Sequence, residues 1–395
     1  MIRRVAKCVS FRDCKTTDKL LVALLIFFYL SIFQWSTDNM EVVPGSSKKL
    51  KLLASLPTMG YEKANPYVYA LPYNRSVTGT EFSVDHELFK SLLVPEDQYI
   101  SLTTDNAEDF VFATGSNAAF YPMLKEAVAS IQHHRPKNKI LVYDLGLSPN
   151  EIVEIKSWCN VIYRSFNFTI FPSHVKKLVT YAWKPLIIMD VLKDYPGVLW
   201  MDSSVRVVMS DFSGLFKDVV KTKGGISLTT SGHSTFAATH RGMYKYLPTD
   251  MEAIKREEQR EATLMFYRTR EMYENVLRWL AMCALQRECI APTLVRTCRF
   301  KNDNRRRWGR CHRFDQSAVN ILFSNYFGHN SWNYYAKTRV VKIERFVSGE
   351  YKLHNSDCAF TEKKMVIRAE IRKGKIILPD SKYRTSHPSR VTVQL

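Results

Sequence analysis

Short apolar runs alternate with helical patterns of apolar residues between positions 110 and 202, and this alternation limits the fold more than any other feature. Strands that are separated by helices pair in parallel, because each crossover returns the chain to the same end of the sheet. The sequence therefore predicts an α/β fold with a mostly parallel sheet and helices on both faces. The expected strands are 110–114, 139–144, 161–166 and 198–202.

Several helices are expected from their start signals or their periodicity. Ser148 is followed three residues later by Glu151, which is a capping-box pattern. Further helices are expected over 183–195 and 315–326, where apolar residues recur at helical spacing. The stretch 249–285 is predicted to form one or two helices for the same reason.

Polar residues follow the predicted strands directly. Thr114, Gly115 and Ser116 follow the first strand, Asp144 the second and Asp202 the last. Ligands of parallel sheets bind at the carboxyl ends of the strands, so these residues are expected to line one crevice. Asp202 ends an apolar strand, where a carboxylate is costly to bury unless it binds a metal or a hydrogen-bonded ligand. Capping of the next loop is the alternative for Asp202.

Gly115 and Lys184 suit a ligand that carries phosphate. Gly115 lets the backbone approach a nucleotide closely, although a glycine after a strand is also an ordinary turn signal. Lys184 begins a strongly apolar helix. Its ammonium would either reach a diphosphate as a point charge or remain a solvated helix end. Both readings of each residue stay open.

The stretch 20–37 has no charged residue and is long enough to cross a hydrocarbon core about 30 Å thick. Residues 1–19 before it hold six basic residues against two acidic ones, which keeps the N-terminus in the cytosol. A cleaved signal peptide is the alternative, but its apolar region is usually shorter and ends in small residues. We therefore expect a cytosolic tail, a transmembrane signal anchor and a lumenal remainder.

The lumenal remainder divides into three parts by composition. Residues 38–107 carry frequent proline and glycine with little periodicity, which indicates a stem. Residues 108–360 hold the α/β pattern and are expected to form the lumenal domain. Residues 361–395 form a basic tail, in which the apolar run 375–378 is a candidate edge strand.

Six cysteines and two glycosylation sequons fall on the lumenal side. Six cysteines allow three disulfides, in fifteen connectivities that spacing does not separate. A zinc site is the alternative for four of them, but their spacing contains no C-x-x-C pair. The sequons begin at Asn74 and Asn167. The cysteines are Cys159, Cys283, Cys289, Cys298, Cys311 and Cys358.

Five sequence blocks, taken in order, resemble nucleotide-sugar glycosyltransferases of the GT-A fold, those related to glycogenin in particular. Two of the blocks, YAWKP and W-x-D-x-S, are also similar to an uncharacterised group of invertebrate membrane-anchored proteins. The resemblance implies a Golgi type II membrane enzyme that moves a sugar from a nucleoside diphosphate to a glycan or glycoprotein. The blocks are FATGSN at 112–117, YD at 143–144, YAWKP at 181–185, LWMDSS at 199–204 and FDQSAVN at 314–320.

The resemblance also implies how the donor would be bound. In the GT-A family a strand-end Asp-x-Asp binds Mn²⁺ or Mg²⁺ and, through it, the diphosphate of a UDP-sugar. Asp202 matches the first acid, but Ser204 stands at the second, so metal dependence is open. Arg206 and Lys184 are candidates to neutralise the diphosphate instead. His354 stands at a place comparable to that of a late histidine ligand of the family.

Asp315 and Gln316 match an Asp-Gln pair that lies beside the donor sugar and acceptor in the family. Asp315 would act as a base toward the acceptor in an inverting enzyme or orient the sugar in a retaining one. The alternative is that Asp315 only caps the start of the following helix. The candidate nucleotide-sugar-binding residues are Thr114, Gly115, Ser116, Asp144, Lys184, Asp202, Ser204 and Arg206.

The chain is basic, with 57 Lys and Arg against 38 Asp and Glu and a net charge of +19. Eight of the basic residues lie within 296–313, with Phe300 and Trp308 interleaved and Cys298 and Cys311 near its ends. A bridged basic loop of this kind suits an anionic acceptor, such as a sulfated or uronic-acid glycan. A solvated loop without a ligand is the alternative. Nucleic acid is not expected as a partner in a lumenal compartment.

Two other functions stay open. A lumenal sulfotransferase would share the anchor, the disulfides and the basic cleft, but it should carry a basic phosphosulfate loop after the first strand. Residues 114–117 contain no basic residue. The absent second acid also allows a catalytically inactive GT-A-like binding protein.

Overall fold

The computed structural model describes residues 63–64, 66–71, 75–355, 370–372 and 375–377. These residues belong to one compact unit that spans Gly60–Leu395. No helix within the described ranges combines the length and apolar character needed to cross a membrane. The expected membrane anchor, the sequon at Asn74 and Cys358 lie outside the described residues.

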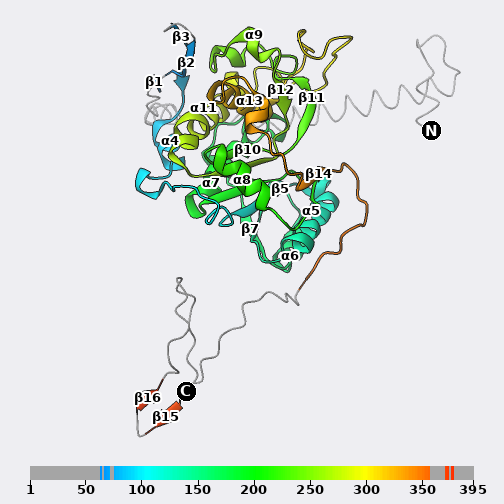
Figure 1. The fold of residues 1–395 in the computed structure, drawn as a ribbon. Helices are drawn as coiled ribbons and strands as arrows, with labels where there is room; N and C mark the ends of the chain where they lie inside the picture. Colours follow the sequence, from blue (N-terminus) through cyan, green and yellow to red (C-terminus); the bar gives the residue numbers. More distant parts are fainter. Residues whose placement is uncertain (1–62, 65, 72–74, 356–369, 373–374, 378–395) are drawn as a thin grey trace, which may run out of the picture. The chain divides into compact units, whose positions relative to one another are not determined.

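A six-stranded sheet forms the centre of the unit (Figure 1). In spatial order its strands are β10 (Gly225–Ser227), β13 (Leu264–Tyr267), β8 (Gly197–Trp200), β5 (Val111–Ser116), β6 (Ile140–Asp144) and β7 (Val161–Ser165). Strands β8, β5, β6 and β7 are parallel, whereas β13 is antiparallel to both of its neighbours. The prediction of a mostly parallel α/β sheet is confirmed.

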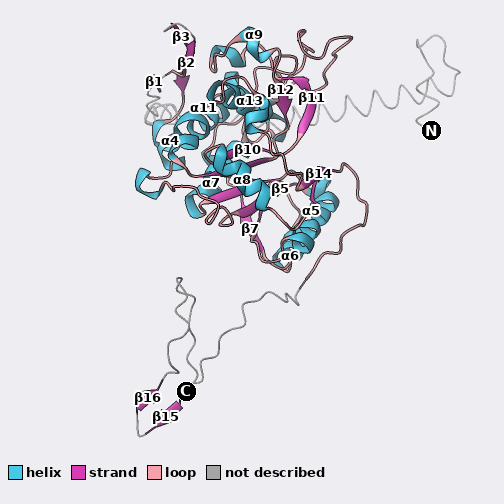
Figure 2. Cartoon of the chain, viewed as in Figure 1, coloured by secondary structure: helices cyan, strands magenta, loops and turns pink. Residues whose placement is uncertain are grey.

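Helices cover both faces of the sheet, as predicted (Figure 2). Phe112 and Leu199 point to one face, and the adjacent residues Ala113 and Trp200 point to the other, because side chains alternate along a strand. The first face packs against α5 (Tyr121–His134), α6 (Pro149–Lys156) and α8 (Ser213–Lys221), and the second against α7 (Trp183–Asp194), α11 (Arg278–Leu285) and α13 (Phe314–Tyr326).

The capping box that the sequence predicts at α6 is confirmed. The backbone N–H of Glu151 donates to the Ser148 hydroxyl at 3.4 Å, and the backbone N–H of Ser148 donates to the Glu151 carboxylate at 2.7 Å. These two bonds satisfy backbone donors that a helix start leaves without partners. They fix the beginning of α6 after β6.

The stretch 249–285 is not helical throughout, so that prediction was wrong in part. Met265 and Phe266 lie in β13, an inner strand of the sheet between β10 and β8. All four residues of β13 are buried, and such a short apolar run has no periodicity that separates a strand from a helix. The elements of this stretch are α9 (Met251–Ile254), β12 (Glu258–Arg260), β13, α10 (Arg270–Met272), a π-helical turn (Tyr273–Leu277) and α11.

The described part of the segment expected to be a stem packs against the folded body. Helix α4 (His86–Leu92) begins at the N-cap Asp85 and buries Phe89 and Leu92 in the main core. Phe82 of the preceding strand is also fully buried there. Residues 82–94 therefore help to form the core.

The remaining described strands occur in pairs. Residues 375–377, within the run considered as an edge strand, pair with their own neighbour strand and not with the six-stranded sheet. The pairs are β1 (Lys63–Ala64) with β4 (Phe82–Ser83), β2 (Val68–Leu71) with β3 (Arg75–Thr78), β9 (Val205–Val207) with β14 (Val341–Ile343), β11 (Thr230–Ser234) with β12, and β15 (Glu370–Arg372) with β16 (Lys375–Ile377).

Two disulfides join described cysteines and remove the zinc alternative for these residues. Cys283 is bonded to Cys289, and Cys298 is bonded to Cys311. Cys159 is also disulfide-bonded. The first bond joins the end of α11 to α12 (Arg287–Ile290), and the second closes the basic stretch into a loop.

Candidate active site

A pocket of about 780 Å³ lies at the carboxyl ends of β5 and β8. This volume is in the range of sites that hold small-molecule ligands and cofactors. The ends of the two strands, the start of α7 and the start of α13 all contribute to its walls. Of the residues that the sequence singled out, the pocket is lined by Gly115, Ser116, Lys184, Asp202, Ser204, Asp315 and Gln316.

Lys184 joins two acids in the wall of this pocket. Its Nζ lies 2.9 Å from Oδ1 of Asp202 and 2.9 Å from Oδ2 of Asp315, and its side chain is only 3% exposed. The rings of Tyr181 and Trp200 also face the ammonium, at 5.6 and 5.7 Å from their centroids. Burial alone would lower the pKa of Lys184, but the two carboxylates outweigh it and hold the pKa above its ordinary value. The ammonium is therefore charged.

The two acids have different surroundings. The Asp202 side chain is 41% exposed, and its Oδ1 also accepts a hydrogen bond from Trp200 Nε1 at 3.0 Å. The Asp315 side chain is only 7% exposed. Burial raises the pKa of Asp315, with the Lys184 ammonium acting in the opposite direction. Asp315 is thus part of the wall, while Asp202 remains accessible to a ligand.

Two large residues beside this ion cluster have a left-handed backbone. The φ angle is 53° at Tyr181 and 47° at Phe314, a conformation that costs about 1–3 kcal/mol for residues other than glycine. Their ring centroids lie 5.8 Å apart. Tyr181 precedes Lys184 by three residues, and Phe314 directly precedes Asp315. Such strain concentrates at functional sites, where the surrounding structure holds it in place.

The donor set around Asp202 does not fit a divalent cation. Mn²⁺ and Mg²⁺ need several oxygen ligands, of which at least one is usually a carboxylate free to coordinate the ion. The Lys184 ammonium already contacts both Asp202 and Asp315, and the neutral Ser204 stands at the position of the second acid. Within the described part of the chain, no three His, Cys, Asp or Glu side chains come together as a metal site.

Arg206 does not line the pocket, although the sequence made it a candidate for the diphosphate. Its side chain is fully buried, with Nη2 3.1 Å from Glu126 and Nε 3.8 Å from Glu344. Its Nη1 donates to the Ser203 carbonyl at 2.6 Å. The chain turns between β8 and β9, so Ser204 and Arg206 do not share one strand face. Arg206 is a structural residue.

Three other candidates also lie outside the pocket lining. Asp144 Oδ1 accepts the backbone N–H groups of Gly146 and Leu147 at 2.8 and 2.7 Å, which stabilises its own loop. His354 is exposed and is not part of the ion cluster. Thr114 is buried within β5.

Three arginines that the sequence did not single out as donor ligands line the same pocket: Arg296, Arg313 and Arg345. Arg345 lies 3.6 Å from the Glu261 carboxylate. Arg313 Nε is buried and has no hydrogen-bond partner among the described residues. Arg296 and Arg313 belong to the basic stretch 296–313, which the sequence suggested for an acceptor, and Arg313 directly precedes the FDQSAVN block.

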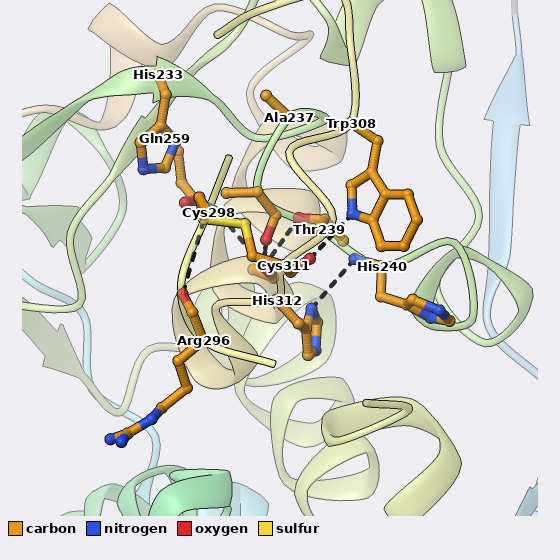
Figure 3. Close-up of a disulfide and its surroundings, with 12 residues drawn as sticks. His233, Ala237, Thr239, His240, Gln259, Arg296, Cys298, Trp308, Cys311 and His312 are labelled. Carbon is orange, nitrogen blue, oxygen red and sulfur yellow. Dashed lines mark hydrogen bonds between the residues drawn. A yellow bond between two sulfur atoms is a disulfide. The ribbon is translucent and has the colours of Figure 1, made fainter. Parts of the chain in front are cut away.

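A buried histidine holds the base of the loop formed by residues 296–313 (Figure 3). His312 follows Cys311 directly, and its Nδ1 accepts the backbone N–H of His240 at 3.2 Å. Its Nε2 lies 3.0 Å from the Ile290 carbonyl and therefore donates. Burial lowers the pKa of His312 to about 3. The ring is neutral, and each of its nitrogens has one partner.

Comparisons with known proteins give a family of unknown function and a set of distant structures. The family model described as "Protein of unknown function (DUF1647)" matches residues 59–189. No curated protein matches the chain in sequence.

The galactosyltransferase LgtC, in complex with donor and acceptor sugar analogues, is 12% identical over 60% of this chain and 87% of its own, with a TM-score of 0.36. The bifunctional glycosyltransferase WbbM is 16% identical over 58% of this chain and 39% of its own, with a TM-score of 0.34. The glycosyltransferase GlyE of Streptococcus pneumoniae TIGR4 is 14% identical over 58% of this chain and 44% of its own, with a TM-score of 0.31. At this similarity, the function has to be argued from the residues of the chain itself.

Replacing Arg206 with Met should destabilise the fold by about 3–5 kcal/mol, because Glu126 then keeps a buried charge without its partner. Urea unfolding followed by circular dichroism measures the loss. Arg339→Met, at an exposed arginine, is the control and should change the free energy of unfolding by less than about 0.5 kcal/mol. Equal stabilities of the two variants would contradict a structural role for Arg206.

His312 should make the fold sensitive to mild acid. The unfolded chain takes up a proton on this residue below about pH 6.5, while the folded protein does so only near pH 3. Stability is therefore lost as the pH falls from about 6.5 toward 3, by about 2 kcal/mol between pH 7 and 5. Urea unfolding at both pH values should show a smaller loss in His312→Gln, and an unchanged loss in the exposed control His133→Gln. The same loss in all three proteins would contradict this assignment.

Proposed function

We propose that this protein transfers a sugar from a nucleoside diphosphate donor, such as a UDP-sugar, to a glycan or glycoprotein acceptor. The observation that carries the proposal is the buried Lys184 ammonium, fixed between Asp202 and Asp315 in the wall of the pocket. The pocket lies at the carboxyl ends of parallel strands, where nucleotides bind in sheets of this kind. Lys184, Asp202 and Asp315 also belong to the sequence blocks that resemble the GT-A family.

Lys184 takes the place beside Asp202 that a divalent cation has in the GT-A family. The three side chains of the ion cluster together carry one net negative charge, so a diphosphate needs additional positive charge. Arg296 and Arg313 line the same pocket and supply it. Arginine is suited to this role, since its planar guanidinium binds phosphate oxygens in pairs.

The other pocket residues have roles that follow from their positions. Gly115 and Ser116 end β5 and present backbone to the nucleotide. The accessible carboxylate of Asp202 accepts hydrogen bonds from donor hydroxyl groups. Asp315 holds Lys184 in position through its own ion pair.

The proposed compartment is the Golgi lumen, with residues 20–37 as the membrane anchor of a type II protein. The disulfides Cys283–Cys289 and Cys298–Cys311 support an oxidising compartment. Asn167 is exposed, and its side chain accepts a hydrogen bond from the Thr169 hydroxyl at 2.7 Å. This sequon is therefore accessible for glycosylation.

UDP should bind to the full-length chain with the same affinity in Mn²⁺ and in EDTA, because the Lys184 ammonium already occupies the space beside Asp202. Titration calorimetry measures both affinities. The absence of binding under both conditions would sink the proposed function. Binding that requires Mn²⁺ would show that Asp202 forms a cation site with a rearranged Lys184.

Replacing Arg313 with Ala should weaken UDP binding by roughly 10- to 100-fold, because a charge-assisted hydrogen bond to the diphosphate is lost. Arg310→Ala removes the same charge from an exposed residue of the same loop outside the pocket lining, and it should change the affinity by less than about twofold. Melting temperatures would verify that both variants fold. If the two variants bound UDP equally well, Arg313 would not be a diphosphate ligand.

A further inference from the structure

We infer that the loop of residues 296–313, called the basic loop from here on, binds the acceptor and that the acceptor is an anionic glycan with sulfate or uronate groups. The inference rests on the proposed function, because the basic loop borders the pocket that we assign to the donor. It adds the chemical class of the second substrate.

The basic loop carries a high density of positive charge that the fold leaves uncompensated. Its one acid, Asp303, accepts the backbone N–H groups of Arg305 and Arg306 at 2.8 and 2.7 Å and forms no ion pair with a described residue. None of the exposed basic side chains of the loop pairs with a carboxylate in the described ranges. These side chains are Arg296, Arg299, Lys301, Arg305, Arg306, Arg307 and Arg310.

The charges cannot move apart freely, because the loop is fixed at several points. The Cys298–Cys311 disulfide closes it. Backbone bonds hold its interior, including Arg299 N–H to the Gly309 carbonyl at 2.7 Å and Gly309 N–H to the Ala237 carbonyl at 2.8 Å. Repulsion between like charges is thus built into the free protein. A polyanion relieves this repulsion and meets a surface that is already ordered, which lowers the entropic cost of binding.

The basic loop borders the donor pocket, which is the position expected for an acceptor-binding surface. Arg296 and Phe300 belong to the loop and also line the donor pocket. Figure 3 shows the Arg296 side chain pointing away from the disulfide, with Trp308 on the opposite side of it. Trp308 is 40% exposed, and its ring centroid lies 5.3 Å from that of His240, so the residue offers an apolar surface to a sugar ring. A glycan along the loop reaches the pocket with one end.

The experiment compares glycans of different charge on the full-length chain in detergent. Fluorescently labelled heparin, hyaluronan and dextran oligosaccharides of equal length are titrated at two salt concentrations. We expect binding of heparin or hyaluronan that weakens at high salt, and no binding of dextran. Hyaluronan carries uronate without sulfate, so binding of both glycans would indicate recognition of uronate, whereas binding of heparin alone would indicate that sulfate is required.

A triple variant tests whether the loop is the site. Arg299→Ala, Arg306→Ala and Arg307→Ala together should weaken anionic glycan binding about tenfold or more, with UDP affinity unchanged. The matched control replaces three exposed lysines outside the loop with Ala: Lys90, Lys217 and Lys221. It should change the glycan affinity by less than about twofold. Equal losses in both variants would overturn the inference, because net charge alone would then explain binding.

The two proposals fail in distinguishable ways. UDP binding without any preference for anionic over neutral glycans would overturn this inference alone. Single-stranded DNA that binds the wild-type chain as tightly as heparin would also overturn it, since the loop would then attract any polyanion. Glycan binding without UDP binding would leave the loop as a glycan site and would overturn the proposed transfer reaction.

Discussion

The ion cluster of Lys184, Asp202 and Asp315 fixes the geometry of the candidate active site. The three residues come from α7, the end of β8 and α13, which are far apart in the sequence. Burial of one ammonium costs several kcal/mol unless opposite charges compensate it, and here two carboxylates do so at 2.9 Å. The loss of one acid would leave a buried charge with less compensation. Each carboxylate compensates part of the buried positive charge of Lys184. The two ion pairs therefore hold α7, the end of β8 and α13 together at the pocket.

An ammonium differs from a divalent cation in ways that shape the rest of the pocket. It is covalently attached, carries a single charge and cannot bridge a carboxylate to a diphosphate with coordinate bonds. With two acids beside it, the cluster is slightly negative, so positive charge for a phosphorylated donor must come from elsewhere. Arg296 and Arg313 lie at the base of the basic loop and also line the pocket. The donor pocket and the basic loop thus share these two arginines.

The sequence predicted those features that depend on neighbouring residues, and it missed those that depend on distant ones. Asp202 and Lys184 stood out because a strand end and a helix start are local signals. Their ion pair was not predictable, because it depends on how α7 packs against the sheet. Arg206 was misplaced as a pocket residue because the turn between β8 and β9 changes which side chains share a face. The four residues of β13 were taken as helical because a short buried run has no distinctive period.

Lys184 in the pocket wall and His312 at the base of the basic loop respond differently to acid, and this follows from the groups around them. The Lys184 ammonium keeps its charge, because Asp202 and Asp315 hold its pKa above the ordinary value against the effect of burial. His312, which holds the base of the basic loop, is stable only as a neutral ring between His240 and Ile290. Burial of this ring begins to cost free energy as the pH falls below about 6.5. The disulfide next to it does not titrate, so it keeps the loop closed while the contacts of His312 weaken.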